Sequence, residues 1–275
     1  MKVLKVFESS PAQDGDGVRI SRVADFSGKL LDPFLMIDEL KSEDKSDFIG
    51  GFPPHPHRGI ETFTYILKGG FEHRDQLGNC KHINAGDVQW MSTGFGMVHS
   101  EMPLADHDGM HGFQIWVNMP AKDKLRPPRY ADSVADKSPE LTDDAGSRLR
   151  ILAGRWTLAE QTAVSPIGPL AAEASIADLT MTAGNLVTLD LSHHQQAFVY
   201  LYRGRLSGYV AGQLLLLDPA YPIELQTEDD CGLLIFSGNR IAEPVAHMGP
   251  FVMNTPAELM QAVQDYQAGK FGSIG

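Results

Sequence analysis

Three features of the sequence predict a mainly antiparallel β fold. Its clearest apolar segments are short, rich in β-branched and aromatic residues, and bounded by glycine or proline; they cover residues 61–67, 113–118, 197–202 and 232–236. Helical periodicity is clear only near the C-terminus, and 27 glycines and 17 prolines supply turns. Many short strands without intervening helices are typical of a β-barrel or jelly roll rather than a βαβ sheet.

A stretch between the strand-rich halves predicts a domain boundary. Residues 122–148 are charged, contain three prolines and show neither hydrophobic period, which is typical of a linker. On either side, residues 65–69 and 200–204 both place aromatic strand residues before a basic residue and a glycine. This similarity indicates a duplicated domain. We expect an N-terminal domain over residues 1–131 and a C-terminal domain over 146–275.

One helix is predicted close to the C-terminus. Thr255 is followed by Pro256 and by Glu258, which forms a capping box with proline at the first helical position. The helix should run to about Gln267, with a stripe of apolar residues at helical spacing: Leu259, Val263 and Tyr266. Such a stripe favours a structural role, packed against a barrel.

Composition excludes several classes of function. The formal net charge of −12 is unfavourable for direct binding to nucleic acid. Two cysteines, Cys80 and Cys231, cannot supply a disulfide framework or a four-thiolate metal site. No segment has the roughly 20 apolar residues needed to cross a bilayer, and Lys2 and Lys5 interrupt the N-terminal apolar residues. We therefore expect a cytoplasmic protein with no membrane association.

The densest group of residues able to bind a metal lies in the N-terminal half. His55 and His57 are two positions apart, as are His99 and Glu101, and Glu61 follows the first pair. Residues two apart on a strand point to one face, so each pair can aim both side chains at a common point. Four ligands from two strands could thus converge inside one barrel.

These residues belong to a longer pattern. The spacing of His55, His57, Glu61, Gly69, Gly96 and His99 resembles the two cupin motifs, and further segments resemble the pirin family of cupins. Those segments are residues 32–38, 50–59, 86–91, 99–103 and 249–255. The resemblance covers most of the chain and is less distinctive in the second half apart from the last segment.

The resemblance implies two tandem cupin domains, each a jelly-roll β-barrel, with one metal in the N-terminal barrel. Carried over by position, the ligands are His55, His57, His99 and Glu101. The general cupin pattern would choose Glu61 instead of Glu101. We take Glu101 as the ligand, and leave open whether Glu61 orients a ligand or is an ordinary strand residue.

The implied ligand set mixes nitrogen and oxygen donors without a thiolate. Such a set suits one divalent transition metal, for which we expect Fe(II), with Mn, Ni, Cu or Zn as alternatives. In the C-terminal half, aligning Gly204 with Gly69 places Asp190, Ser192 and Gln196 opposite His55, His57 and Glu61. The second domain is therefore expected to bind no metal.

The resemblance also implies an Fe-dependent quercetin 2,3-dioxygenase, an oxidoreductase that opens the central ring of a flavonol with O2. Glu101 would be both a ligand and the base that accepts the flavonol hydroxyl proton, and aromatic residues such as Phe52 and Trp90 would line the pocket. The alternative is a non-catalytic, redox-sensing regulator that acts through protein partners. The expected ligands are a small flavonol-like aromatic and O2, and the expected oligomeric state is a monomer.

Overall fold

The computed structural model describes residues 1–26, 30–104, 108–167 and 170–274. Contacts divide the chain into two compact units, which we describe one at a time. The histidine unit comprises residues 11–29, 34–135 and 241–275, and the apolar unit comprises residues 1–10, 30–33 and 136–240. Among the described residues, no helix is both long and apolar enough to span a membrane.

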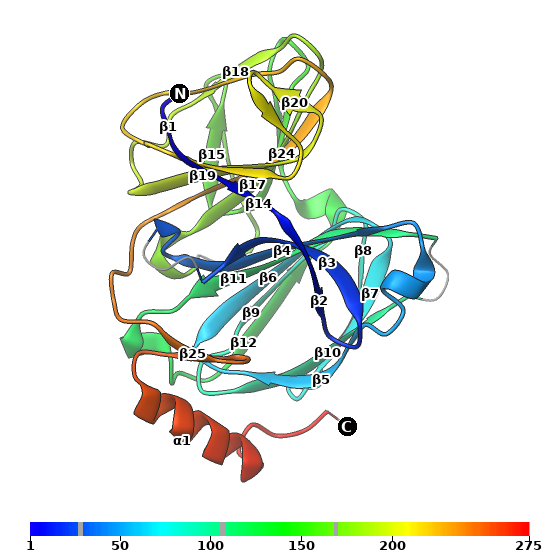
Figure 1. The fold of residues 1–275 in the computed structure, drawn as a ribbon, viewed down its shortest axis with the longest axis vertical. Helices are drawn as coiled ribbons and strands as arrows, with labels where there is room; N and C mark the ends of the chain where they lie inside the picture. Colours follow the sequence, from blue (N-terminus) through cyan, green and yellow to red (C-terminus); the bar gives the residue numbers. More distant parts are fainter. Residues whose placement is uncertain (27–29, 105–107, 168–169, 275) are drawn as a thin grey trace. The chain divides into compact units, whose positions relative to one another are not determined.

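The histidine unit contains a seven-stranded and a four-stranded antiparallel sheet (Figure 1). In spatial order, the larger sheet consists of β12 (Arg129–Ser133), β9 (Val88–Ser92), β6 (Ile60–Lys68), β11 (Met110–Asn118), β4 (Phe34–Ser42), β3 (Val18–Asp25) and β2 (Ser10–Asp14). The smaller sheet consists of β5 (Phe52–His57), β10 (Met97–Pro103), β7 (Gly70–Asp75) and β8 (Cys80–Asn84).

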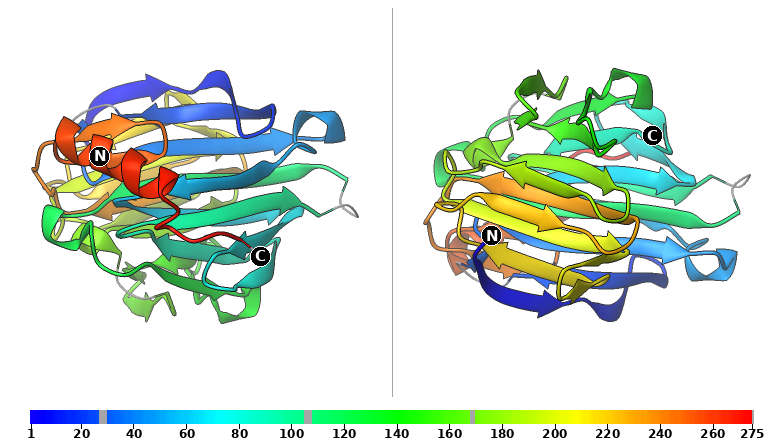
Figure 2. Two further views of the ribbon diagram at one scale, coloured as in Figure 1. Left: turned by 90° about the horizontal axis from the view of Figure 1, so that it is seen from below. Right: turned by 90° about the horizontal axis from the view of Figure 1, so that it is seen from above.

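The apolar unit is built on a second seven-stranded antiparallel sheet, whose central strands lie side by side in Figure 2. In spatial order, its strands are β1 (Val3–Glu8), β22 (Gln213–Leu217), β19 (Gln196–Arg203), β24 (Cys231–Gly238), β17 (Ser175–Met181), β14 (Arg148–Ala153) and β13 (Glu140–Thr142). Three two-stranded antiparallel sheets complete it: β15 (Arg155–Leu158) with β16 (Gln161–Val164), β18 (Leu186–Leu189) with β23 (Ile223–Gln226), and β20 (Arg205–Leu206) with β21 (Tyr209–Val210).

The prediction of an all-β protein of two jelly-roll cupin domains with one C-terminal helix is confirmed. The ladders of each unit are open sheets rather than one closed barrel. Alternate residues of each strand share a face, which sets the interior of each unit. In the apolar unit this face carries a continuous cluster of buried aliphatic side chains, such as Ala177 and Leu179 on β17 and Leu233 and Ile235 on β24.

The C-terminal helix α1 (Pro256–Gln267) begins and ends as predicted, and both hydrogen bonds of its capping box are present. Figure 1 shows it next to the hairpin of β25 (Ala246–Met248) and β26 (Phe251–Met253). Its buried residues Leu259 and Ala262 pack with Val98 of β10 and with Phe271. The helix therefore stabilises the histidine unit, although residues 146–275 were expected to form one C-terminal domain.

Both ends of the chain differ from the predicted continuous domains of residues 1–131 and 146–275. Residues 1–10 belong to the apolar unit, where β1 pairs with β22, and residues 241–275 belong to the histidine unit. The change of unit at residues 135 and 136 falls inside the predicted linker. Apolar periodicity shows that an element is buried but does not identify its partner, which explains the difference.

Candidate metal centre

Strands β5 and β10 bring the three predicted histidines together. The two strands pair antiparallel, with His55 directly opposite His99 and His57 opposite Met97. In β5, the prolines at positions 54 and 56 alternate with the histidines. Because β5 is the edge strand of its sheet, prolines without a backbone N–H are tolerated there, and the histidines keep a common face.

The three imidazoles converge on one point. One ring nitrogen from each of His55, His57 and His99 lies within 4.8 Å of the other two. The ring centroids are 4.8 Å apart for His55 and His57, 4.3 Å for His55 and His99, and 5.0 Å for His57 and His99. Among the residues that the structure describes, this is the one such group able to hold a metal ion.

The hydrogen bonding of these histidines fits a metal site. His99 is completely buried, and neither of its ring nitrogens has a hydrogen-bond partner among the described residues. A buried polar atom without a partner is costly, and a metal that takes the lone pair of this imidazole would remove that cost.

Two backbone carbonyls orient the other imidazoles. Nδ1 of His55 lies 2.8 Å from the carbonyl oxygen of Pro53, and Nδ1 of His57 lies 3.4 Å from that of Pro250. Only a protonated ring nitrogen can donate to a carbonyl, so these contacts place the proton on Nδ1 and leave the Nε2 lone pair available. The tail of the chain thus contributes to the site through Pro250.

Burial keeps two of the imidazoles neutral. It holds the pKa of His57 well below its ordinary value, and the neighbouring His55 reinforces the shift against the opposing effect of the Pro250 carbonyl. Burial likewise lowers the pKa of His99, with additional contributions from His55, His57 and His73. A neutral imidazole is the form that binds a metal, so both residues are ready to do so near neutral pH.

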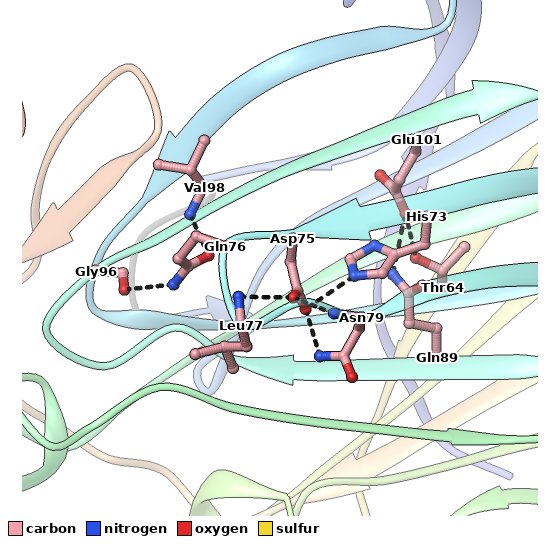
Figure 3. A network of polar contacts seen from close by, with 10 residues as sticks. All are labelled: Thr64, His73, Asp75, Gln76, Leu77, Asn79, Gln89, Gly96, Val98 and Glu101. Atoms are coloured by element: carbon pink, nitrogen blue, oxygen red, sulfur yellow. Dashed lines mark hydrogen bonds and ion pairs between the residues drawn. The ribbon is translucent and has the colours of Figure 1, made fainter. Parts of the chain in front are cut away.

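Glu101 lines the same cavity as His55 and His57 but lies outside the group of atoms within 4.8 Å. Figure 3 shows its carboxylate near two neutral side chains on the facing strands. Thr64 Oγ1 lies 3.1 Å and Gln89 Nε2 lies 3.3 Å from its Oε1, and Gln114 Nε2 lies 3.4 Å from its Oε2. These groups hold the buried carboxylate beside the imidazoles, and its role as a ligand stays a prediction.

Glu61 lies on the other face of its strand. It is three positions from Thr64 on β6, and residues an odd number apart point to opposite faces. Its fully buried carboxylate lies 3.3 Å from Nη2 of Arg126, which also donates to Ser92. The general cupin alternative, with Glu61 beside the imidazoles, finds no support in this arrangement.

His73 was not singled out in the sequence, and the structure places it beside Glu101 and His99, on the same face of the smaller sheet. It lies opposite Glu101 in the pairing of β7 with β10, and its ring centroid is 5.6 Å from that of His99. Its Nε2 lies 3.1 Å from Oδ2 of Asp75, which also accepts from Asn79 (Figure 3). Burial alone would raise the pKa of Asp75, but the hydrogen bonds from His73 and Asn79 outweigh it and lower that pKa.

A cavity of about 560 Å³ opens beside the triad, within the histidine unit. Apolar and aromatic side chains form much of its wall; they include Ile20, Phe26, Met36, Leu40, Phe52 and Trp116. The prediction that Phe52 lines the pocket is confirmed. Trp90 does not line the cavity, because it is adjacent to Gln89 on β9 and so faces away from Glu101.

Charged residues that the sequence analysis missed also line this cavity. Arg22 on β3 donates from Nε and Nη2 to the two carboxylate oxygens of Asp38 on β4, both at 2.9 Å, and also contacts Asp14. Burial raises the pKa of Asp38, although Arg22 opposes the shift. The signal was present in the sequence, because Asp38 directly follows four apolar residues, 34–37, of a strand segment.

The C-terminal tail is fastened to the strand that carries the histidines. Arg58, next to His57, bridges to Phe251 and accepts a 3.0 Å backbone hydrogen bond from Val252. Its guanidinium lies 3.0 Å from Asp265 of α1, and both side chains are buried. Lys124 Nζ, also buried, donates to the carbonyl oxygens of Gly59 and Val252.

The aligned positions of the apolar unit are arranged differently. Asp190 and Ser192 are exposed, and Oδ1 of Asp190 accepts from the backbone N–H of Ser192. Gln196 donates to the carbonyl oxygen of Leu30. His194 is buried beside His193, and its Nδ1 lies 2.9 Å from the Ser237 hydroxyl. That this unit binds no metal stays a prediction.

The chain is similar to known proteins of the pirin family. Residues 17–117 match the family model described as Pirin, and residues 176–272 match that of the Pirin C-terminal cupin domain. A Vibrio cholerae protein, provisionally named a quercetin 2,3-dioxygenase, is 42% identical over 98% of this chain and 97% of its own length. A pirin-like protein of Caulobacter vibrioides is 37% identical over 98% of both chains.

Solved structures show the same similarity. That of a quercetin 2,3-dioxygenase from Acinetobacter baumannii superposes with a TM-score of 0.89 at 30% identity, over 100% of this chain and 99% of the other. A bacterial pirin from Escherichia coli in complex with nickel(II) has a TM-score of 0.61 at 20% identity, over 86% and 99% of the two chains. At that identity the second likeness concerns the fold alone.

Proposed function

Because this chain belongs to the pirin family, we propose that it is a metal-dependent dioxygenase that opens the central ring of flavonols such as quercetin. One observation carries the proposal: three imidazoles converge beside a cavity of about 560 Å³, and neither ring nitrogen of His99 has a hydrogen-bond partner among the described residues. A cavity of that size accommodates a small aromatic molecule. The provisional name of the Vibrio cholerae relative and the Acinetobacter baumannii structure support the same chemistry.

We propose that His55, His57, His99 and Glu101 hold one divalent metal, and that this metal is Fe(II). Three imidazoles and one carboxylate, without thiolate, suit Fe(II), Mn, Ni or Cu. Nickel stands as an alternative because the same donor set also suits it. When bound, such a metal supplies Lewis-acid and redox chemistry toward the flavonol and O2.

Glu101 is proposed to act as the base. The flavonol hydroxyl nearest the triad donates its proton to a carboxylate oxygen of Glu101, which three neutral side chains hold in position. Thr64, Gln89 and Gln114 carry no charge, so they orient the carboxylate without neutralising it. The aromatic walls, including Phe52 and Trp116, would pack on the planar rings and exclude water.

Turnover of quercetin in air by protein reconstituted separately with Fe(II), Mn, Ni, Cu and Zn tests the proposal. We expect turnover with Fe(II), and we expect Glu101→Gln to abolish it and to weaken metal retention. Glu61→Gln is the matched control, because Glu61 is equally buried but bound to Arg126. It should keep turnover within about tenfold of the wild type.

Two results would contradict the proposal. Loss of metal in Glu61→Gln with full retention in Glu101→Gln would show that the ligand assignment is wrong. If no metal supports turnover of any flavonol while folded protein retains the metal, the catalytic proposal fails and the regulatory alternative replaces it. Circular dichroism of the β content would establish that each variant is folded.

A further inference from the structure

A row of polar side chains crosses the inner face of the larger sheet of the histidine unit. Strand pairing places Arg22 opposite Asp38, Asp38 opposite Gln114, and Gln114 opposite Thr64. The row begins at the partly exposed Arg22, and both Gln114 and Thr64 lie within hydrogen-bond distance of Glu101. It therefore extends from the solvent side of the cavity to the proposed metal centre.

The charge in this cavity is predominantly negative. Four carboxylates line it, those of Asp14, Asp25, Asp38 and Glu101, whereas Arg22 is the one lysine or arginine among the described lining residues. Asp14 and Asp25 lie at exposed positions, and Asp38 is buried. A carboxylate on the end of the ligand remote from the proposed metal would meet these like charges, which disfavours an anionic group there.

Asp38 retains hydrogen-bonding capacity. A carboxylate has about four acceptor positions, and the guanidinium of Arg22 occupies two of them. The bidentate contact fixes the orientation of the carboxylate and supports its charge. Asp38 lies opposite Gln114 on the neighbouring strand, about 5 Å away across the sheet. Gln114 Nε2 in turn lies 3.4 Å from Oε2 of Glu101, so one side chain separates Asp38 from the proposed metal centre.

We propose that Asp38, fixed by Arg22, determines the specificity of this cavity by accepting hydrogen bonds from hydroxyl groups on the far ring of an uncharged aromatic ligand. The ligand class is a neutral polyphenol with a hydroxylated ring remote from its metal-binding end, and aromatic carboxylates are rejected. This inference rests on the proposed function, because one end of the ligand is taken to lie at the histidine triad. It goes further by assigning the recognition of the other end.

Anaerobic binding titrations with metal-loaded protein test the inference without requiring turnover. The first pair of probes is quercetin and galangin, flavonols that differ in the two hydroxyl groups on the far ring. We expect quercetin to bind about 10- to 100-fold more tightly, as is typical of a hydrogen bond to a charged acceptor. Asp38→Asn should remove most of that preference and leave the affinity for galangin unchanged.

Glu39→Gln is the matched control. Glu39 is adjacent to Asp38 and is also buried, but it faces the other side of β4, where it lies 2.8 Å from His111 Nε2. This variant should retain the preference for quercetin. Equal affinity of the wild type for both flavonols, or an equal loss for both in Asp38→Asn, would overturn the inference.

A second variant covers the case in which Asp38→Asn does not fold. Asp14→Asn combined with Asp25→Asn changes two exposed positions. Asp14 contacts Arg22, but the two hydrogen bonds from Arg22 to Asp38 do not involve either residue. The probes are catechol and 3,4-dihydroxybenzoate, and the wild type should prefer catechol. The double variant should narrow this preference by about two- to fivefold, and a wild type that binds the carboxylate as tightly as catechol would contradict the inference.

The two proposals can fail separately. If the protein shows this binding pattern but the bound flavonol never reacts with O2, the proposed dioxygenase function is wrong and the role assigned to Asp38 holds. If the protein opens the central ring of quercetin and of galangin, and binds both with equal affinity, the proposed dioxygenase function holds and the role assigned to Asp38 is wrong.

Discussion

The two units use the same strand framework and fill it with opposite chemistry. Aligning Gly69 with Gly204, both of which have a φ of +80°, matches β6 to β19 residue by residue. Thr62 and Thr64, on the inner face of β6, then correspond to Ala197 and Val199, which belong to the buried aliphatic cluster of the apolar unit. One strand position therefore holds a hydrogen-bonding group in one unit and a hydrocarbon in the other.

This difference supports placing the proposed function in the histidine unit. Among the described residues, the apolar unit buries 22 hydrophobic residues in one cluster, so its interior is filled and stabilised by apolar burial. The histidine unit gives up part of that burial on the corresponding face, and uses the space for imidazoles, Glu101 and a cavity. Two units with the same strand framework thus differ in their interiors: one is filled by hydrocarbon, and the other contains polar side chains beside a cavity.

The units also differ in how they use charge. In the histidine unit, Arg58 and Asp265 form a buried ion pair. In the apolar unit, Arg205 pairs with Asp229 at 2.8 Å, with 57% and 48% of the two side chains exposed. Breaking a buried pair leaves an uncompensated charge, whereas an exposed pair contributes little, so the units should respond differently to loss of charge.

The largest effect should come from removing a histidine of the triad. We expect wild-type protein to bind about one transition metal per chain and His99→Ala to lose nearly all of it, because the imidazole with two unpartnered nitrogens is removed. His194→Ala, which removes a largely buried histidine of the apolar unit, should keep the full metal content. Elemental analysis of the folded variants measures the metal content of each. An equal loss of metal in His99→Ala and His194→Ala would contradict the prediction that only the histidine unit binds the metal.

The next largest effect should come from the buried ion pair. Asp265→Asn should lower the free energy of unfolding at pH 7 by about 3 kcal/mol, whereas Asp229→Asn should change it by less than about 0.5 kcal/mol. Lys270 contributes most to lowering the pKa of Asp265 to about 2, with Arg58 also contributing. Urea unfolding of both variants would measure the contrast, and similar costs would refute it.

The same residue makes the stabilisation pH-dependent. The folded-state pKa of Asp265 lies below its ordinary value of 3.8, so the charged carboxylate favours the folded state. Its contribution is complete above about pH 4 and is lost as the pH falls toward 2. The difference between the wild type and Asp265→Asn should therefore shrink over this range, and a constant difference would argue against the ion pair.

The smallest effects should come from exchanging the matched strand residues. Thr64→Val removes a hydroxyl that contacts Glu101 and Gln114, so it should lower quercetin turnover by about 10- to 100-fold, with about 1 kcal/mol lost in stability. Val199→Thr places a hydroxyl among hydrocarbons, so it should cost about 1–3 kcal/mol in stability and leave turnover and metal content unchanged. A loss of turnover in Val199→Thr, together with normal turnover in Thr64→Val, would contradict the roles assigned to the interiors of the two units.

The local features of the fold could be predicted because their causes are local. The helix Pro256–Gln267 follows from its capping residues, and the strands follow from alternation and bounding glycines. The convergence of His55, His57 and His99 was also predictable. His55 and His57 share one face of β5, so the pairing of β5 with β10 alone brings them next to His99. Each prediction depended on residues close together in sequence or on the family resemblance.

The long-range features could not be predicted in this way. Asp38 and Arg22 become neighbours only through the register of β3 with β4, and His73 lies opposite Glu101 only through the register of β7 with β10. A shift of one residue would turn each side chain to the opposite face, and no local pattern records the register.

The sequence by itself therefore determined the class of fold, the duplicated strands, the C-terminal helix and the three histidines. Tertiary structure alone decided that the last 35 residues, 241–275, belong to the unit that carries the histidines, where Pro250 orients His57 and Asp265 pairs with Arg58. It also decided which face Glu61 and Glu101 occupy. The physical reason is that periodicity specifies which side of an element is buried, whereas the partner that buries it is selected by contacts between distant parts of the chain.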